Sequence, residues 1–157
     1  MKPTIRSTNQ GRTVAFVGDV YRFLATGEET NGKYAMFEAL VGPGGGPPTH
    51  VHSREEEGFY ILEGEITLTV NGERIVATAG MFANVPVGTP HSFKNEGSKP
   101  AKMLISVAPA GLEKMFIEAG ITLADGANSA LPPTKEEIEK LLAIAPKYGI
   151  EIKPPGH

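Results

Sequence analysis

The chain has 157 residues, 40% of them apolar and 21% charged, which suits a single soluble globular domain with a sizeable core. Its net charge of −3 gives no reason to expect binding to nucleic acid. We expect a cytoplasmic protein, because the sequence shows no apolar run near the ~18 residues that span a membrane and no apolar leader typical of secretion. Because there is no cysteine, any bound metal must be held by nitrogen and oxygen atoms rather than by thiolates.

Short segments rich in aromatic and β-branched residues follow one another from about residue 13 to residue 107, separated by glycine and proline, and they predict β-strands joined by tight turns. The expected strands are residues 20–26, 33–41, 57–62, 66–70, 73–79, 81–85, 91–95 and 101–108. The dipeptide Asn71-Gly72 separates two of them and is a strong signal for a two-residue hairpin. Strands at this density indicate an all-β sandwich or barrel.

After Pro109 the apolar spacing becomes helical. The first predicted helix covers residues 111–120 and places on one face Leu112, Met115, Phe116 and Ala119. The second begins at Thr134, which forms a capping box with Glu137, and it ends at Gly149. Its apolar stripe comprises Ile138, Leu141, Leu142, Ala145 and Tyr148. We expect both helices to pack outside the β-core, with these stripes serving as core packing rather than as a binding surface.

Two histidines, His50 and His52, lie two residues apart in the sequence THVH. Residues i and i+2 of a strand share a face and lie ~6–7 Å apart, so both imidazoles can converge on one ion at ~2.0–2.1 Å. A third nitrogen ligand must come from one of the two remaining histidines. His157 is the last residue and is discounted because chain ends are usually mobile, whereas His91 begins a predicted strand after a turn.

Three consecutive glutamates follow the histidine pair, and strand parity separates them. Glu57 leads the segment EGFYIL and shares its face with Phe59 and Ile61, where an unpaired carboxylate would be costly to bury. Glu55 and Glu56 have no such apolar continuation, and we interpret them as exposed turn charges. Parity therefore predicts Glu57 as the carboxylate of the site.

These residues resemble the two motifs of the cupin superfamily. Residues 44–64 fit G-x5-H-x-H-x4-E-x6-G, and residues 80–95 fit G-x5-P-x-G-x2-H-x3-N, with every fixed position filled. The fixed positions are Gly44, His50, His52, Glu57 and Gly64 in the first motif, and Gly80, Pro86, Gly88, His91 and Asn95 in the second. Fifteen residues separate the motifs, as in compact single-domain cupins.

The resemblance implies a small jelly-roll barrel (a double-stranded β-helix) over residues 13–108, with a helical extension over residues 110–150 of the same 157-residue domain. It also implies one divalent transition-metal ion per chain, Fe, Mn, Ni, Co, Cu or Zn, held by His50, His52, Glu57 and His91 with one or two open positions. The tail is similar, more loosely, to that of quercetinase-like bacterial monocupins.

A metal-dependent dioxygenase is the first hypothesis for the reaction. By analogy with quercetinase-like cupins, an enol or phenol oxygen of the substrate would bind the metal, and Glu57 would act as the catalytic base before dioxygen attacks. The predicted substrate pocket is apolar, because strand parity places Phe59 and Ile61 beside Glu57 and Phe93 beside His91. The expected partner is thus a small aromatic or enol-type molecule.

Two other classes of function stay open. One is a metal-dependent isomerase, epimerase or lyase of a sugar or hydroxy acid, which would need basic residues in the pocket that the ligand-sharing faces lack. The other is a cupin that binds a small molecule without turnover. The resemblance also implies a homodimer, in which a strand at residues 13–17 could pair with the partner's sheet.

Overall fold

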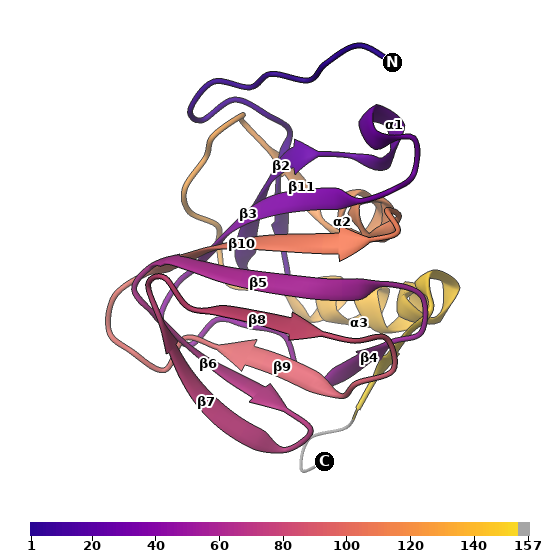
Figure 1. Cartoon of the computed structure of the whole chain (residues 1–157). Helices are drawn as coiled ribbons and strands as arrows, with labels where there is room; N and C mark the ends of the chain where they lie inside the picture. Colours follow the sequence, from indigo (N-terminus) through magenta and orange to yellow (C-terminus); the bar gives the residue numbers. More distant parts are fainter. Residues whose placement is uncertain (154–157) are drawn as a thin grey trace.

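The computed structural model describes residues 1–153 and consists of two antiparallel sheets with short helices beside them (Figure 1). The first sheet has seven strands, in the order β11 (Ile121–Leu123), β1 (Thr13–Phe16), β2 (Asp19–Ala25), β3 (Ala35–Val41), β10 (Ala101–Ala108), β5 (Glu56–Glu63) and β8 (Phe82–Val85). The second has five, in the order β12 (Ile150–Ile152), β4 (His50–His52), β9 (His91–Lys94), β6 (Glu65–Val70) and β7 (Glu73–Thr78). The helices are α1 (Gly27–Thr30), α2 (Leu112–Ala119), α3 (Lys135–Ile144) and the 3-10 helix η1 (Ala145–Tyr148).

The predicted all-β jelly-roll class is confirmed, and the expected strands lie within a few residues of their predicted bounds. Strict alternation explains how they form the core. In β3, Ala35, Phe37, Ala39 and Val41 are buried while the intervening residues are partly exposed. β10 repeats this pattern and pairs with β3 along its whole length. The predicted hairpin joins β6 and β7, and both Asn71 and Gly72 take the positive φ that a two-residue turn requires.

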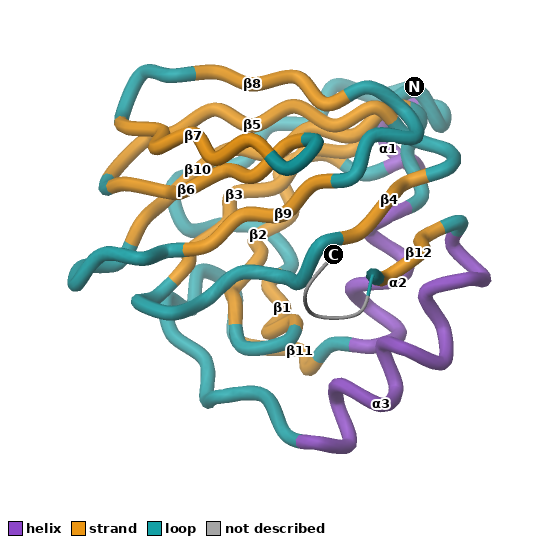
Figure 2. The backbone as a smooth tube through the Cα atoms, turned by 90° about the horizontal axis from the view of Figure 1, so that it is seen from below, coloured by secondary structure: helices purple, strands orange, loops and turns teal. Residues whose placement is uncertain are grey.

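Helix α2 lies outside the strands, as predicted, and its predicted apolar face is buried. Phe116 enters an aromatic cluster, with its ring centroid 4.7 Å from that of Phe16 and 4.5 Å from that of Tyr21. Figure 2 shows α2 and α3 lying together at one side of the sheets. The helical extension therefore shares the core of the strands that precede it.

The second predicted helix is shorter than expected. Its capping box is confirmed, because Glu137 N donates to Thr134 Oγ1 at 3.1 Å and Thr134 N donates to the Glu137 carboxylate at 2.9 Å. The α-helix ends at Ile144 because Pro146 has no N–H with which to continue the helical hydrogen-bond ladder; η1 then continues to Tyr148. Leu141 and Ala145 of the predicted stripe are buried, whereas Ile138 and Leu142 are 41% and 52% exposed, respectively.

Two three-residue strands in the C-terminal extension were missing from the prediction, because segments this short carry no readable alternation. β11 pairs with β1, and β12 pairs with β4. Both edges of β1 are thus paired within the chain. The outer edge of the seven-stranded sheet belongs to β11, whereas the N-terminal strand at residues 13–17 was expected from the sequence to be free to pair with a partner's sheet. Among the described residues, no helix is long and apolar enough to cross a membrane.

Candidate metal centre

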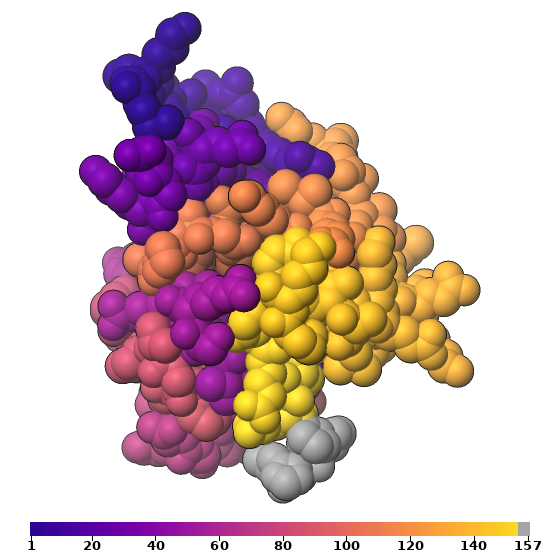
Figure 3. All heavy atoms as spheres, turned by 90° about the vertical axis from the view of Figure 1, so that its right-hand side faces the viewer, coloured from indigo at the N-terminus to yellow at the C-terminus, as the bar shows by residue number. Residues whose placement is uncertain are grey.

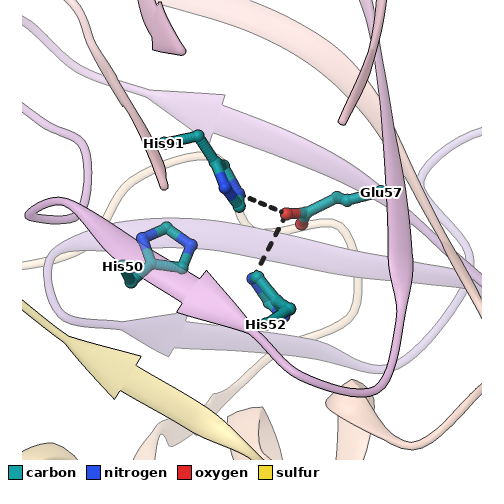
Figure 4. A group of neighbouring side chains, drawn as sticks. All are labelled: His50, His52, Glu57 and His91. Atoms are coloured by element: carbon teal, nitrogen blue, oxygen red, sulfur yellow. Dashed lines mark hydrogen bonds and ion pairs between the residues drawn. The ribbon is translucent and has the colours of Figure 1, made fainter. Parts of the chain in front are cut away.

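The four predicted ligands come together from three strands of the two sheets (Figure 4). β4 supplies His50 and His52, and β9 places His91 directly opposite His50 in the strand register. Glu57 comes from β5 in the other sheet, where it pairs with Val85 and Val107. One donor atom from each of the four residues lies within 4.8 Å of every other. The jelly-roll fold thus brings the candidate ligands of the two sequence motifs together in one cluster.

Glu57 is at the centre of this cluster. Its Oε1 atom lies 2.9 Å from Nε2 of His91 and 3.3 Å from Nε2 of His52, as the dashed lines in Figure 4 mark. Glu57, His52 and His91 are each at least 95% buried, while His50 is partly exposed. A buried carboxylate between imidazoles is the arrangement expected when the group binds a cation.

Each histidine is held by its outer ring nitrogen. Nδ1 of His50 donates to the carbonyl oxygen of Pro48, and Nδ1 of His91 donates to that of Thr89, both at 2.8 Å. Nδ1 of His52 instead donates to Oε1 of Glu55 at 2.6 Å. These bonds occupy the outer nitrogen of each ring and leave Nε2 as the atom that could bind a metal, which at His91 would replace the contact with Glu57.

The interpretation of Glu55 as an exposed turn charge was wrong, because its side chain is buried, with a residue exposure of 4%, against His52. The lack of an apolar continuation was misleading here, because Glu55 precedes β5 and lies in the turn that begins at Ser53, where an i,i+3 contact back to His52 buries its side chain. That i,i+3 spacing was the available signal. Glu56 is exposed, as predicted, and accepts a hydrogen bond from Asn84.

Burial and the neighbouring charges set the protonation of the cluster. Burial lowers the pKa of His50 to about 4, with help from His91, so its ring is neutral at neutral pH. Burial alone would lower the pKa of His52, but the Glu55 hydrogen bond and the nearby carboxylates outweigh it and raise that pKa. Burial alone would raise the pKa of Glu57, but the hydrogen bond from His91 and the surrounding imidazoles lower it, which keeps Glu57 ionised.

The donor set fits a divalent metal ion. Among the buried side-chain nitrogen and oxygen atoms of residues 1–153, Nε2 of His52 is the one that makes no hydrogen bond, and it faces the other three donors. Three imidazole nitrogens and one carboxylate are ligands that suit iron, manganese, nickel, cobalt, copper and zinc. The cluster could therefore hold one such ion, as predicted, whereas His157, the discounted fourth histidine, lies outside the described residues.

A cavity of about 50 Å³ adjoins the cluster, and its walls are almost wholly apolar. His50, His52 and Glu57 line it on one side, and none of its lining residues within the described range 1–153 is a lysine or an arginine. Of the three predicted pocket residues, Phe93 lines the cavity, while Phe59 and Ile61 are buried in the core and are not part of the lining. A wider hollow of about 620 Å³ lies among the N-terminal residues and includes none of the four candidate ligands.

Most of the other cavity walls come from residues that the sequence analysis did not assign to the site. The N-terminal strands contribute Phe16 and Tyr21. The C-terminal extension contributes Leu112, Met115, Phe116, Leu141, Ile150 and Ile152. The buried stripes of the two helices were the only available signal, and they were interpreted as core packing alone. In the structure the same side chains both pack the core and close the space over the candidate ligands.

Comparison with known proteins gives the family. Residues 37–107, which contain all four candidate ligands, match the family of cupin domains, Cupin_2. Residues 37–107 therefore form a cupin domain. The quercetin 2,3-dioxygenase of Bacillus subtilis is 32% identical to this cupin over 97 residues, which are 62% of this chain and 29% of that enzyme. The cupin spans less than two thirds of the length of the first curated relatives it matches.

Solved structures agree on the fold. An RmlC-like cupin from Shewanella frigidimarina superposes with a TM-score of 0.63 at 20% identity, over 72% of this cupin and 96% of that chain. A predicted oxalate decarboxylase from Thermotoga maritima gives a TM-score of 0.62 at 24% identity, over 68% of this cupin and 99% of that chain. At these identities the likeness establishes the shared barrel, and the chemistry has to be argued from the site.

Proposed function

We propose that this cupin is a metal-dependent dioxygenase that acts on a neutral, apolar substrate with an enol or phenol oxygen. The observation that carries the proposal is a largely aromatic and aliphatic cavity, with no lysine or arginine among its described lining residues, placed directly against a three-histidine, one-glutamate cluster. Such a cavity favours a neutral ring system over a charged metabolite. The similarity to a quercetin 2,3-dioxygenase supports the same class of reaction.

In this proposal Glu57 is the base. Its lowered pKa keeps the carboxylate ionised, and it lines the cavity, so it can accept the hydroxyl proton of a bound enol or phenol. A redox-active divalent ion held by the four ligands would supply the path for electrons between the deprotonated substrate and dioxygen. The apolar walls exclude water, and both atoms of dioxygen end in the products.

The size of the cavity adds a condition. Ligand pockets usually measure ~300–1,000 Å³, whereas the free space at this site is about 50 Å³. Dioxygen fits that space, but an aromatic ring does not. Binding of such a substrate therefore requires the wall formed by Leu141, Ile150 and Ile152 to move outward. Figure 3 shows the yellow C-terminal segment, to which these residues belong, at the surface of the molecule.

The same lining weakens the alternative of an isomerase, epimerase or lyase of a sugar or hydroxy acid. Substrates of that kind often carry phosphate or carboxylate groups, which proteins bind with arginine or lysine. Among residues 1–153, neither arginine nor lysine lines the cavity. A cupin that only binds its ligand would retain an unchanged molecule through purification and would consume no oxygen.

Oxygen consumption by the metal-loaded protein tests the proposal. The metal-free protein is reconstituted separately with Fe, Mn, Ni, Co, Cu or Zn, and a flavonol is supplied with and without oxygen. We expect oxygen-dependent loss of the flavonol with at least one metal, and its abolition in Glu57→Gln. Failure of every metal form to consume any flavonol would refute the substrate class, and turnover without oxygen would favour the isomerase or lyase.

A homodimer remains a prediction, which light scattering tests.

A further inference from the structure

The three histidines of the cluster differ in what holds their outer ring nitrogen. His50 and His91 donate to neutral backbone carbonyl groups, whereas His52 donates to the carboxylate of Glu55 over 2.6 Å. Among the hydrogen bonds of residues 1–153, the Glu55 carboxylate has His52 as its one partner. This charged contact is not part of the cupin ligand set and has no role in the proposed proton transfer.

We propose that Glu55 is a positioning residue that fixes the ring of His52 and strengthens it as a metal ligand. The proposal rests on the metal site in the proposed function and extends it, because it assigns to this residue control over metal affinity. Burying a carboxylate is costly unless a partner compensates for it, and His52 Nδ1–H is that partner. A carboxylate on the outer nitrogen of a ligating histidine raises the basicity of the inner nitrogen and sets the ring plane.

The turn that carries Glu55 is held in place from the far end of the chain. Ser53 donates two hydrogen bonds to the carbonyl oxygen of Gly149, from its backbone N and from its hydroxyl, both at 2.9 Å. A Cβ atom on Gly149 would lie 2.6 Å from Ser53 Oγ and 2.9 Å from Arg54 Nε, so the turn packs closely on this glycine. Glu55 is therefore presented to His52 by a constrained turn and not by a free loop.

The contact also makes the site asymmetric. His52 is the ring whose inner nitrogen is buried and makes no hydrogen bond, and it alone of the three has a charged acceptor on its outer nitrogen. We therefore expect His52 to be the strongest of the three nitrogen donors. Losing the carboxylate weakens it in two separable ways: removal of the charge lowers the basicity of Nε2, and removal of the acceptor frees the ring to rotate.

Cobalt affinity of Glu55 variants tests the inference. Glu55→Gln keeps an acceptor but removes the charge, Glu55→Ala removes both, and Glu56→Gln is the matched control, because Glu56 is the exposed neighbour that contacts Asn84. Co²⁺ is titrated against a chromophoric chelator, and nitrogen NMR of the metal-free proteins reports the tautomer of His52. Circular dichroism shows whether each variant is folded. If Glu55→Ala does not fold, the comparison of Glu55→Gln with the parent still tests the inference.

We expect Co²⁺ to bind Glu55→Ala about 10–100-fold more weakly than the parent, Glu55→Gln to fall between the two, and Glu56→Gln to be unchanged. In metal-free Glu55→Ala, the Nδ1–H tautomer of His52 gives way to a mixture. The inference would be overturned if folded Glu55→Gln and Glu55→Ala bound Co²⁺ as tightly as the parent. It would also be overturned if Glu56→Gln lost as much Co²⁺ affinity as the Glu55 variants, or if the parent bound no Co²⁺. If the parent binds cobalt and consumes no flavonol, the dioxygenase proposal fails and the role of Glu55 stands.

Discussion

Ile150 of the last described strand lies directly opposite His52, and Ile152 lies opposite His50, so the C-terminal end of the chain pairs with the strand that carries two candidate ligands. β12 is the edge strand of its sheet, and its two isoleucines line the cavity. The extension therefore contributes to the site through both backbone pairing and apolar contact. The integrity of the metal centre should depend on residues that lie about a hundred positions after the first histidines.

A proline in β12 tests this dependence. Glu151 lies opposite Val51, between the two histidines, and its side chain is exposed. Glu151→Pro removes a backbone donor from the ladder and should weaken metal binding about tenfold, comparable to the loss of one good hydrogen bond. Glu151→Ala removes only an exposed side chain and its surface ion pair with Lys153, and should bind like the parent. Isothermal titration with Zn²⁺ measures both, and equal affinities for the two variants would show that β12 does not support the site.

Removing a ligand should abolish tight metal binding. A zinc site with four protein ligands contributes ~10–16 kcal/mol in total, so the loss of His91 in His91→Ala should cost roughly 3 kcal/mol, or about a hundredfold in affinity. Zinc content after dialysis and the rise in melting temperature on adding Zn²⁺ are the two measurements. Thr89→Ala is a control at the same turn, because Thr89 contributes only its backbone carbonyl to His91. Retention of zinc by His91→Ala would exclude that residue as a ligand.

Metal affinity should fall in acid, and His52 should be protonated before His50. The pKa of His52 is raised, so protons compete for its Nε2 atom early as the pH falls; the pKa of His50 is about 4, so that ring stays neutral until much lower pH. Glu57 remains ionised because its pKa is lowered. Affinity for Zn²⁺ measured from pH 8 to pH 5 should therefore decline, and Glu55→Gln should shift the decline to lower pH, because it removes the charge that raises the pKa of His52. A pH-independent affinity would contradict this order.

The sequence predicted the parts of the site that obey a simple period. Alternation along the strands placed His50, His52 and Glu57, and the motif spacing added His91. The sequence-based prediction failed at Glu55, which belongs to no strand and contacts His52 three residues earlier within a turn. Parity also says which face a residue occupies but not how deep it lies, so it could not distinguish Phe93, which lines the cavity, from Phe59, which lies in the core.

The C-terminal extension shows a second reason for incomplete prediction. The capping box at Thr134 is a local signal and was predicted correctly. The pairing of β12 with β4 joins residues about a hundred positions apart through three backbone positions, and no local pattern encodes it. The role of the helices as a wall of the cavity likewise depends on tertiary placement, because an apolar stripe looks the same whether it covers a core or a ligand site.

Asp19 should make the fold less stable as the pH rises. It is buried at the start of β2, and burial raises its pKa to about 7, although a backbone hydrogen bond from Gly46 acts to lower it. Because the folded state then holds a proton that the unfolded state has released, stability from this group is complete below about pH 4 and is lost as the pH rises toward 7. Asp19→Asn should therefore stabilise the protein at pH 8 by up to about 4 kcal/mol, at about 1.4 kcal/mol per pKa unit. Urea unfolding at pH 4 and pH 8 measures it, with exposed Asp125→Asn as the control; an equal effect at both pH values would contradict the argument.

Two adjacent leucines of α3 lie on different sides of the helix, one in the cavity wall and one on the outer surface. Leu141 is 6% exposed and lines the cavity, whereas Leu142 is 52% exposed and lies outside it. Leu141→Ala should lower the free energy of unfolding by about 2–4 kcal/mol and enlarge the cavity beside the candidate ligands, whereas Leu142→Ala should change stability by less than about 0.5 kcal/mol. Because the free space of about 50 Å³ is what excludes a ring, Leu141→Ala should also bind 3-hydroxyflavone several-fold faster than the parent. Stopped-flow fluorescence measures that rate on folded, metal-loaded protein, and an unchanged rate in Leu141→Ala would show that the ring enters past a different wall.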